Sequence, residues 1–303
     1  MPPSNKNYYA VESPDKLSLV TQVVDTVTSV CRLAEVDVNA YALIDMAFDH
    51  GASHFRTRQL TERLYAEDRW KQLAEVSPTL IQLSVGDQVA LHQQVERLVF
   101  HCARRPMLSF LLSPMTIVEL AQTWRLCIAA EVPGTEPMLL RFADTRVAEV
   151  LPKCLTPANW SFLCRPLEQW WIIDRAGSLL QQPRPSCAPE TEHPVNHNFA
   201  LSDDELERLV HAGLPDALIQ TMCDQLPEMV PDQDRLGYHA LMKKVVDLAE
   251  EHSIDSYPDT YALAVFSVVA GEEALSEAST IDLLKAKAWP SGQLAKKLTE
   301  IML

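Results

Sequence analysis

The chain has 303 residues, and its 41 Asp and Glu against 26 Lys and Arg give a formal net charge of -15 at pH 7. Hydrophobic residues make up 47% and charged residues 22% of the sequence, a composition typical of globular proteins that excludes a disordered or fibrous chain. The acidity argues against nucleic acid and anionic membrane surfaces as partners, because both are bound through clusters of Lys and Arg.

The negative charge is concentrated in the last third of the chain. Residues 198–303 contain 19 Asp and Glu against 8 Lys and Arg, whereas residues 1–197 contain 22 against 18. Solubility is the first explanation for such an asymmetry, and a docking surface for a basic partner is the alternative.

Cysteine usage and the N-terminus both favour a cytoplasmic protein. The seven cysteines are an odd number without a C-x2-C pair, which predicts free, reduced thiols. The segment 1–15 has neither the basic nor the apolar part of a signal peptide. The longest strongly apolar stretch, 261–270, is shorter than the roughly 20 residues that span a bilayer.

In the first hundred residues, apolar patterns predict two helices and two strands. Apolar residues recur at helical spacing over 17–33 and again over 87–102. The short apolar runs 41–46 and 79–83 are typical of buried strands, and the first of them ends near Asp45.

The following segment adds further helices and strands. Residues 107–112 are another apolar run, and we expect Ser113 to cap a helix over 113–125 with a proline in its first turn. The segments 126–131 and 138–142 flank a Pro-Gly turn and predict a hairpin. Two short helices and a final strand complete this part, at 145–151, 157–163 and 168–173.

These elements predict an α/β (α+β) N-terminal domain over 1–180, in which helices flank a mixed sheet. Residues 181–197 carry four prolines without apolar periodicity and predict a linker. Residues 198–303 predict an acidic all-α lobe. Its first helix opens with a capping box from Ser202 to Glu205 and is expected to end at Gly213–Pro215.

The usual motifs of catalysis and cofactor binding are missing from the sequence. Its eight glycines are too dispersed for a phosphate-binding loop, and no GxSxG motif occurs. The pairs His50/His54 and His193/His197 have helical spacing but no further ligand nearby, so loop histidines are favoured over a metal site. We therefore expect no enzyme activity, no cofactor and no metal.

Four charged residues stand out within apolar surroundings. Asp45 is the one carboxylate in its strand, and a buried acid requires a partner. An ion pair with Arg141 or Arg146 is favoured over a catalytic role. Asp144 lies between these two arginines and is expected to cap the helix that follows.

Trp170 and Trp171 are adjacent on a predicted strand, so their rings face opposite sides of the sheet. Core packing on both faces is favoured, and the alternative places one ring in an apolar groove that anchors a partner segment.

Several segments in this order resemble a known family. They are YALIDMA at 41–47, SPTLIQL at 77–83, SPMTIVELAQTWR at 113–125, LLRFADTRV at 139–147 and RPLEQWW at 165–171. The series resembles the type VI secretion effector adaptor, or chaperone, family that is catalogued as domain of unknown function 4123.

The resemblance implies a non-enzymatic protein of the bacterial cytoplasm. Such a protein would bind the N-terminal or PAAR-linked region of a toxic effector. It would then help to load the effector onto the VgrG spike. The residues that would then form the partner-binding surface or the lobe junction are Asp45, Arg141, Asp144, Arg146, Trp170 and Trp171.

Two other classes of function remain open on the sequence. An immunity-like inhibitor could block a toxin with the acidic helical lobe. A hydrolase could have an unrecognised site around Asp45, His50 and His54.

Overall fold

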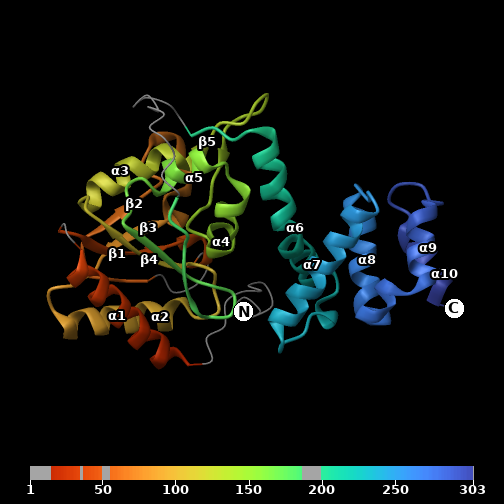
Figure 1. The fold of residues 1–303 in the computed structure, drawn as a ribbon, viewed down its shortest axis with the longest axis horizontal. Helices are drawn as coiled ribbons and strands as arrows, with labels where there is room; N and C mark the ends of the chain where they lie inside the picture. Colours follow the sequence, from red (N-terminus) through yellow and green to blue (C-terminus); the bar gives the residue numbers. More distant parts are fainter. Residues whose placement is uncertain (1–14, 35–36, 50–54, 186–198, 303) are drawn as a thin grey trace. The chain divides into compact units, whose positions relative to one another are not determined.

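The computed structural model describes residues 15–34, 37–49, 55–185 and 199–302 (Figure 1). The chain divides into two compact units, one made mainly of residues 10–209 and the other mainly of residues 210–303. Each unit is described by itself below. Residues 186–197, which form most of the predicted linker, lie outside the described residues.

The first unit contains a six-stranded sheet in the order β2-β3-β1-β4-β7-β8. These strands are β1 (Asn39–Ile44), β2 (Thr61–Arg63), β3 (Thr79–Gln82), β4 (Leu108–Ser113), β7 (Gln169–Ile173) and β8 (Leu179–Gln181). The predicted fold class is confirmed, but the expectation of a mixed sheet is wrong in one respect. Every pair of neighbouring strands in this sheet is antiparallel.

The sheet is antiparallel because of where β1 lies. Helix α2 (Gln88–Cys102) carries the chain from β3 to β4, and these two strands run in the same direction, as in a βαβ unit. They are not neighbours, because β1 lies between them and pairs with both, so that Tyr41 stands opposite Gln82 on one side and Leu111 on the other. The order of elements in the sequence does not specify this insertion.

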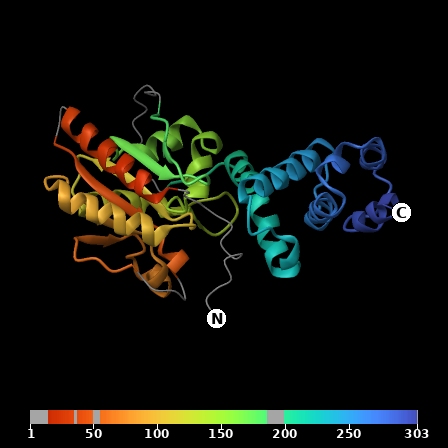
Figure 2. The same cartoon turned by 90° about the horizontal axis from the view of Figure 1, so that it is seen from below.

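Helices cover both faces of the sheet, as Figures 1 and 2 show. Helix α1 (Lys16–Leu33) lies beside α2 on one face, and α3 (Ile117–Ile128), α4 (Thr145–Cys154) and α5 (Pro157–Cys164) lie on the other. Strand β1 is therefore buried on both sides from its second residue onward, which explains why its sequence is continuously apolar instead of alternating.

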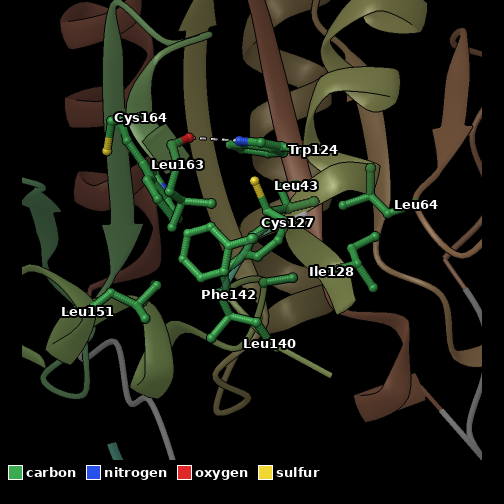
Figure 3. Close-up of a cluster of buried hydrophobic side chains, with 14 of the residues drawn as sticks. Leu43, Leu64, Trp124, Cys127, Ile128, Leu140, Phe142, Leu151, Leu163 and Cys164 are labelled. Atoms are coloured by element: carbon green, nitrogen blue, oxygen red, sulfur yellow. Dashed lines mark hydrogen bonds between the residues drawn. The ribbon is translucent and has the colours of Figure 1, made fainter. Parts of the chain in front are cut away.

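The core between the sheet and α3–α5 is built around aromatic rings (Figure 3). The buried indole of Trp124 donates a hydrogen bond from Nε1 to the carbonyl oxygen of Leu163 at 3.0 Å. Its ring centroid lies 5.0 Å from that of Phe142 and 5.8 Å from that of Trp170. Such tilted aromatic pairs add to the free energy gained by burying their apolar area.

The predicted start of α3 is wrong by a few residues. Thr116 caps the helix and forms a capping box with Glu119. Ser113 instead belongs to β4, where its hydroxyl donates to the carbonyl of Pro166 at 2.6 Å and accepts the Met115 N–H at 3.1 Å. A serine before a proline resembles a helix start, but here its hydroxyl is held by a neighbouring segment.

Helix α3 also extends further than predicted, to Ile128. The hairpin is present but short, with β5 (Ala129–Ala130) pairing antiparallel to β6 (Met138–Leu139). The predicted helices over 145–151 and 157–163 correspond to α4 and α5. The strands β2 and β8 and the 3-10 helices η2 (Met46–Asp49) and η3 (Asp68–Val76) were not predicted.

The second unit is helical throughout its described residues, which confirms the predicted class. Its elements are the larger part of α6 (Asp203–Gln225), whose first residues belong to the first unit, and η4 (Pro227–Met229), α7 (Arg235–Glu251), α8 (Tyr257–Ala270), η5 (Glu272–Ser276), α9 (Ala278–Ala286) and α10 (Leu294–Met302). In the described part of the chain, no helix combines the length and apolar character needed to cross a membrane.

Helix α6 confirms one prediction and contradicts another. The capping box is present, since Glu205 accepts the Ser202 N–H at 2.9 Å and Ser202 Oγ accepts the Glu205 N–H at 3.3 Å. The predicted break at Gly213–Pro215 is absent, and the helix continues to Gln225. A proline inside a helix costs about 3 kcal/mol, whereas burying side chains such as Leu218 and Met222 beyond it gains about 1.5–3 kcal/mol each.

Candidate functional site

Asp45 and Arg141 form an ion pair at the end of strand β1. Asp45 directly follows the strand, and its side chain is only 1% exposed. Arg141 Nη2 donates to Asp45 Oδ2 at 2.7 Å, and the Ala47 N–H donates to Asp45 Oδ1 at 3.0 Å. The buried acid thus has the arginine partner that the sequence led us to expect.

Asp144 and Arg146 form a second pair beside the first. Asp144 caps α4 by accepting the Arg146 N–H at 3.0 Å. Arg146 also donates from Nε to Asp144 Oδ1 at 3.0 Å and from Nη2 to Asp144 Oδ2 at 2.7 Å, which is a bidentate contact. Arg141 lies 3.9 Å from Asp144, so the two pairs make one network of alternating charge.

The ring of Phe48 connects the two arginines. The guanidinium carbons of Arg141 and Arg146 lie 5.5 Å and 5.4 Å from its ring centroid. Both distances are within the range of cation–π attraction. Phe48 lies in η2, just after Asp45, and its role is not evident from the sequence, where it reads as one more apolar residue.

Burial and neighbouring charges shift the pKa values of Asp45 and Arg141. Burial raises the pKa of Asp45, with a further rise from the charge of Asp144, and the nearby Arg141 only partly offsets this. Burial alone would lower the pKa of Arg141, but the charges of Asp45 and Asp144 and the hydrogen bond to Asp45 raise it. Arg141 therefore keeps its positive charge at any physiological pH.

The two tryptophans lie in the core on opposite faces of the sheet. Trp170 stacks on Trp160 with a centroid distance of 5.8 Å and packs edge-on against Phe142 at 6.5 Å. Trp171 pairs across the sheet with Phe110, and it is buried as well. The favoured prediction of core packing on both faces is confirmed, and a direct contact between either ring and a partner stays a prediction.

A second charged cluster was missed from the sequence. Asp49 is fully buried and accepts hydrogen bonds from the Phe55 N–H at 3.0 Å, from His101 Nε2 at 2.9 Å and from Arg105 Nη1. Burial acts to raise the pKa of Asp49, but these hydrogen bonds and the charge of Arg105 lower it. The spacing of His101 and Arg105, four residues apart near the end of α2, is the signal that could have indicated a shared partner.

Metal binding has no support among the residues that the structure describes, since no group of three or more His, Cys, Asp or Glu side chains is suitably placed. The four histidines weighed as metal ligands, at 50, 54, 193 and 197, lie outside the described residues. None of the six described cysteines forms a disulfide, and Cys187 is not among the described residues.

Comparison with known families gives one match. Residues 40–161 match the sequence model of a family described as a domain of unknown function, DUF4123. The matched segment runs from β1 into α5 and includes Asp45, Arg141, Asp144 and Arg146. No curated protein and no solved structure shows a significant match to the chain.

The family match assigns residues 40–161 to a class of domain, and it does not assign a function. It covers less than half of the chain and ends before Trp170, Trp171 and the whole helical unit. The expected relation to DUF4123 is confirmed for residues 40–161, while the role in type VI secretion that we associated with this family stays a proposal.

Proposed function

We propose that this protein is a non-enzymatic adaptor of type VI secretion, which binds an effector in the bacterial cytoplasm and assists its loading onto the VgrG spike. The observation that carries the proposal is the DUF4123 match over residues 40–161. Most of the segments that resemble the effector adaptor family lie within it, from YALIDMA at 41–47 to LLRFADTRV at 139–147.

The geometry of the charged cluster favours binding over catalysis. General acid–base or nucleophilic chemistry needs a side chain that can exchange a proton with a substrate or attack it. Asp45 and Asp144 are instead buried, and each carboxylate is paired with an arginine at 2.7 Å. A cluster of this kind holds a corner of the fold and presents the arginines to the outside.

The acidic helical part is the proposed selector of the effector. It lies beyond the matched segment, and residues 198–303 carry 19 acidic against 8 basic residues. Charge complementarity with a basic effector region would provide specificity and a fast association rate. Added salt should then weaken effector capture more than spike contact, because ions screen exposed charges.

The proposal is tested with the proteins encoded next to this one. If a VgrG-type spike gene and a large effector gene are its neighbours, all three proteins are co-expressed and the full-length chain is purified by a tag. We expect a complex in which this chain binds the N-terminal or PAAR-linked region of the effector, and deletion of its gene should abolish secretion of that effector alone. Secretion that is unchanged by the deletion would overturn the proposal.

The acidity of residues 198–303 also suits a toxin inhibitor, which would cover a basic active site. Co-expression with the isolated toxic domain separates the two functions. An adaptor leaves the isolated toxic domain fully toxic, whereas an inhibitor restores growth of the host cell.

A further inference from the structure

In the charged cluster around Phe48, the carboxylates are buried and the guanidinium groups are partly exposed. The side chains of Asp45 and Asp144 are 1% and 3% exposed, whereas those of Arg141 and Arg146 are 39% and 27% exposed. The cluster is neutral as a whole, but its positive groups face the solvent and its negative groups lie beneath them. An approaching molecule therefore meets two guanidinium groups first.

Arg141 keeps hydrogen-bonding capacity for a partner. A guanidinium group has five N–H donors. Among the described residues, the side chain of Arg141 makes one hydrogen bond, from Nη2 to Asp45. Its Nε and Nη1 are therefore available as donors to a partner, and hydrogen bonds from a charged guanidinium to a carboxylate are stronger than those between neutral groups.

The two arginines are held in place before any partner arrives. Arg146 is fixed by its bidentate contact with Asp144, Arg141 is fixed by Asp45, and both guanidinium groups lie against the ring of Phe48. Arginine side chains normally lose considerable rotamer entropy on binding. Here that loss has largely occurred on folding, so a new contact costs less.

We propose that Arg141 and Arg146, seated on Phe48, form a docking site for a carboxylate-bearing, acidic segment of a partner protein. Arg141 donates to a carboxylate from Nε or Nη1, and Arg146 adds a second positive charge beside it. This inference does not depend on the type VI assignment, because it follows from the cluster alone.

A protein carboxylate fits this site better than a nucleic acid does. Nucleic acids are bound by many phosphate contacts along an extended basic surface. The site offers two arginines within a chain of net charge -15, which repels a long polyanion. One or two carboxylates on a partner segment match two fixed guanidinium groups without that long-range repulsion.

The test uses the full chain with arginine side chains labelled with nitrogen-15, and a short synthetic peptide with one Asp and one Glu as the probe. The Nε–H resonance of Arg141 is assigned from its loss in Arg141→Lys. We expect the peptide to shift this resonance in a saturable manner, and a matched peptide with Asn and Gln to leave it unchanged. Arg141→Lys keeps the charge but loses the planar guanidinium and its fixed donors, and it should weaken peptide binding about tenfold.

Arg69 provides a matched control elsewhere in the same unit. It pairs with Glu67 at 2.5 Å and lies 5.1 Å from the ring centroid of Trp70, so it has the same two kinds of contact. Arg69→Lys should leave peptide affinity unchanged, and Arg146→Lys should lower it. The urea midpoint of each variant shows whether the fold is intact.

Three results would overturn the proposal. The first is the absence of any shift of the Arg141 resonance at millimolar peptide. The second is equal peptide affinity for Arg141→Lys and the wild type. The third is a larger effect of single-stranded DNA or inorganic phosphate on the Arg141 resonance, which would identify a phosphate site instead.

Discussion

Glu205, in the first turn of α6, accepts a hydrogen bond from the backbone N–H of Thr156, the residue that caps α5, at 2.6 Å. The same carboxylate accepts the Asn159 side-chain amide at 2.8 Å and the Ser202 N–H at 2.9 Å. One buried acid therefore serves the N-termini of two helices that are separated by more than forty residues in the chain.

Loss of this carboxylate should destabilise the α/β unit. Glu205→Ala leaves the Thr156 N–H without its acceptor in a partly buried place, and hydrogen bonds to charged groups contribute about 1.5–3 kcal/mol each. We expect the free energy of unfolding to fall by about 2–4 kcal/mol in urea titrations. Glu207, exposed in the same helix, is the control, and an equal loss in Glu207→Ala would contradict this role of Glu205.

Asp259 plays a comparable part within the helical unit. Its buried carboxylate accepts the Gly292 N–H at 2.8 Å and the Leu294 N–H at 2.9 Å, which secures the segment leading into α10. Asp259→Ala should accelerate amide hydrogen exchange at these two positions by at least tenfold, since their acceptor is lost.

Asp259 lies in the first turn of α8, and the exposed Asp255, two residues before that helix, provides the control. Asp255→Ala should leave the exchange rates of Gly292 and Leu294 unchanged. Protected amides in Asp259→Ala would mean that α10 is held by its apolar contacts alone.

Asp45 should make stability fall as pH rises. Because burial raises its pKa in the folded state, the folded protein binds this proton more tightly than the unfolded chain does. The contribution of Asp45 to stability is complete below the unfolded pKa of about 4 and is lost as pH rises through the folded pKa. The unfolding free energy of the wild type minus that of Asp45→Asn should therefore decrease between pH 4 and neutral pH.

Urea titrations at several pH values measure this difference. Asp25→Asn, at an exposed position on α1, is the control for the removal of a carboxylate. A difference for Asp45→Asn that grows with pH would show that the ion pair with Arg141 dominates over burial.

Asp49 should have the opposite pH dependence. Its pKa is lowered in the folded state despite burial, because His101, the Phe55 N–H and Arg105 stabilise the ionised form. Its contribution is complete above the unfolded pKa of about 4 and is lost as pH falls through the lower folded pKa. At pH 7, Asp49→Asn should cost about 3 kcal/mol, since it leaves Arg105 without its buried partner.

The deficit of Asp49→Asn should shrink below pH 4, because there the unfolded wild-type chain takes up a proton at Asp49 before the folded protein does. Urea midpoints at pH 3 and pH 7 measure it, with the exposed Asp68 replaced by Asn as the control. A deficit that is identical at both values would show that hydrogen-bond geometry, and not ionisation, sets the contribution of Asp49.

Much of the site was predictable because its parts are local. Asp144 caps α4 two residues before Arg146, and such contacts within one turn of chain follow from residue type and spacing. Asp45 was recognisable as a buried acid that needed a partner. The choice of Arg141 over Arg146 as its hydrogen-bond donor was not recognisable, because it depends on how the loop before α4 crosses the end of β1.

The contacts that were missed all connect distant segments. Phe48 lies nearly a hundred residues before the two arginines that flank it, and Asp49 lies about fifty residues before His101 and Arg105. No periodicity within either segment indicates the other.

The sequence by itself determined the helices and strands whose apolar spacing is strong, the helical character of the C-terminal part and its acidity. These depend on local backbone preference and on charge, which each segment carries with it. Only the tertiary structure decided that β1 lies between β3 and β4, that α6 continues through Pro215, and that two arginines meet on one aromatic ring. These outcomes depend on which buried surfaces fit together, and that free energy belongs to pairs of segments instead of to any single one.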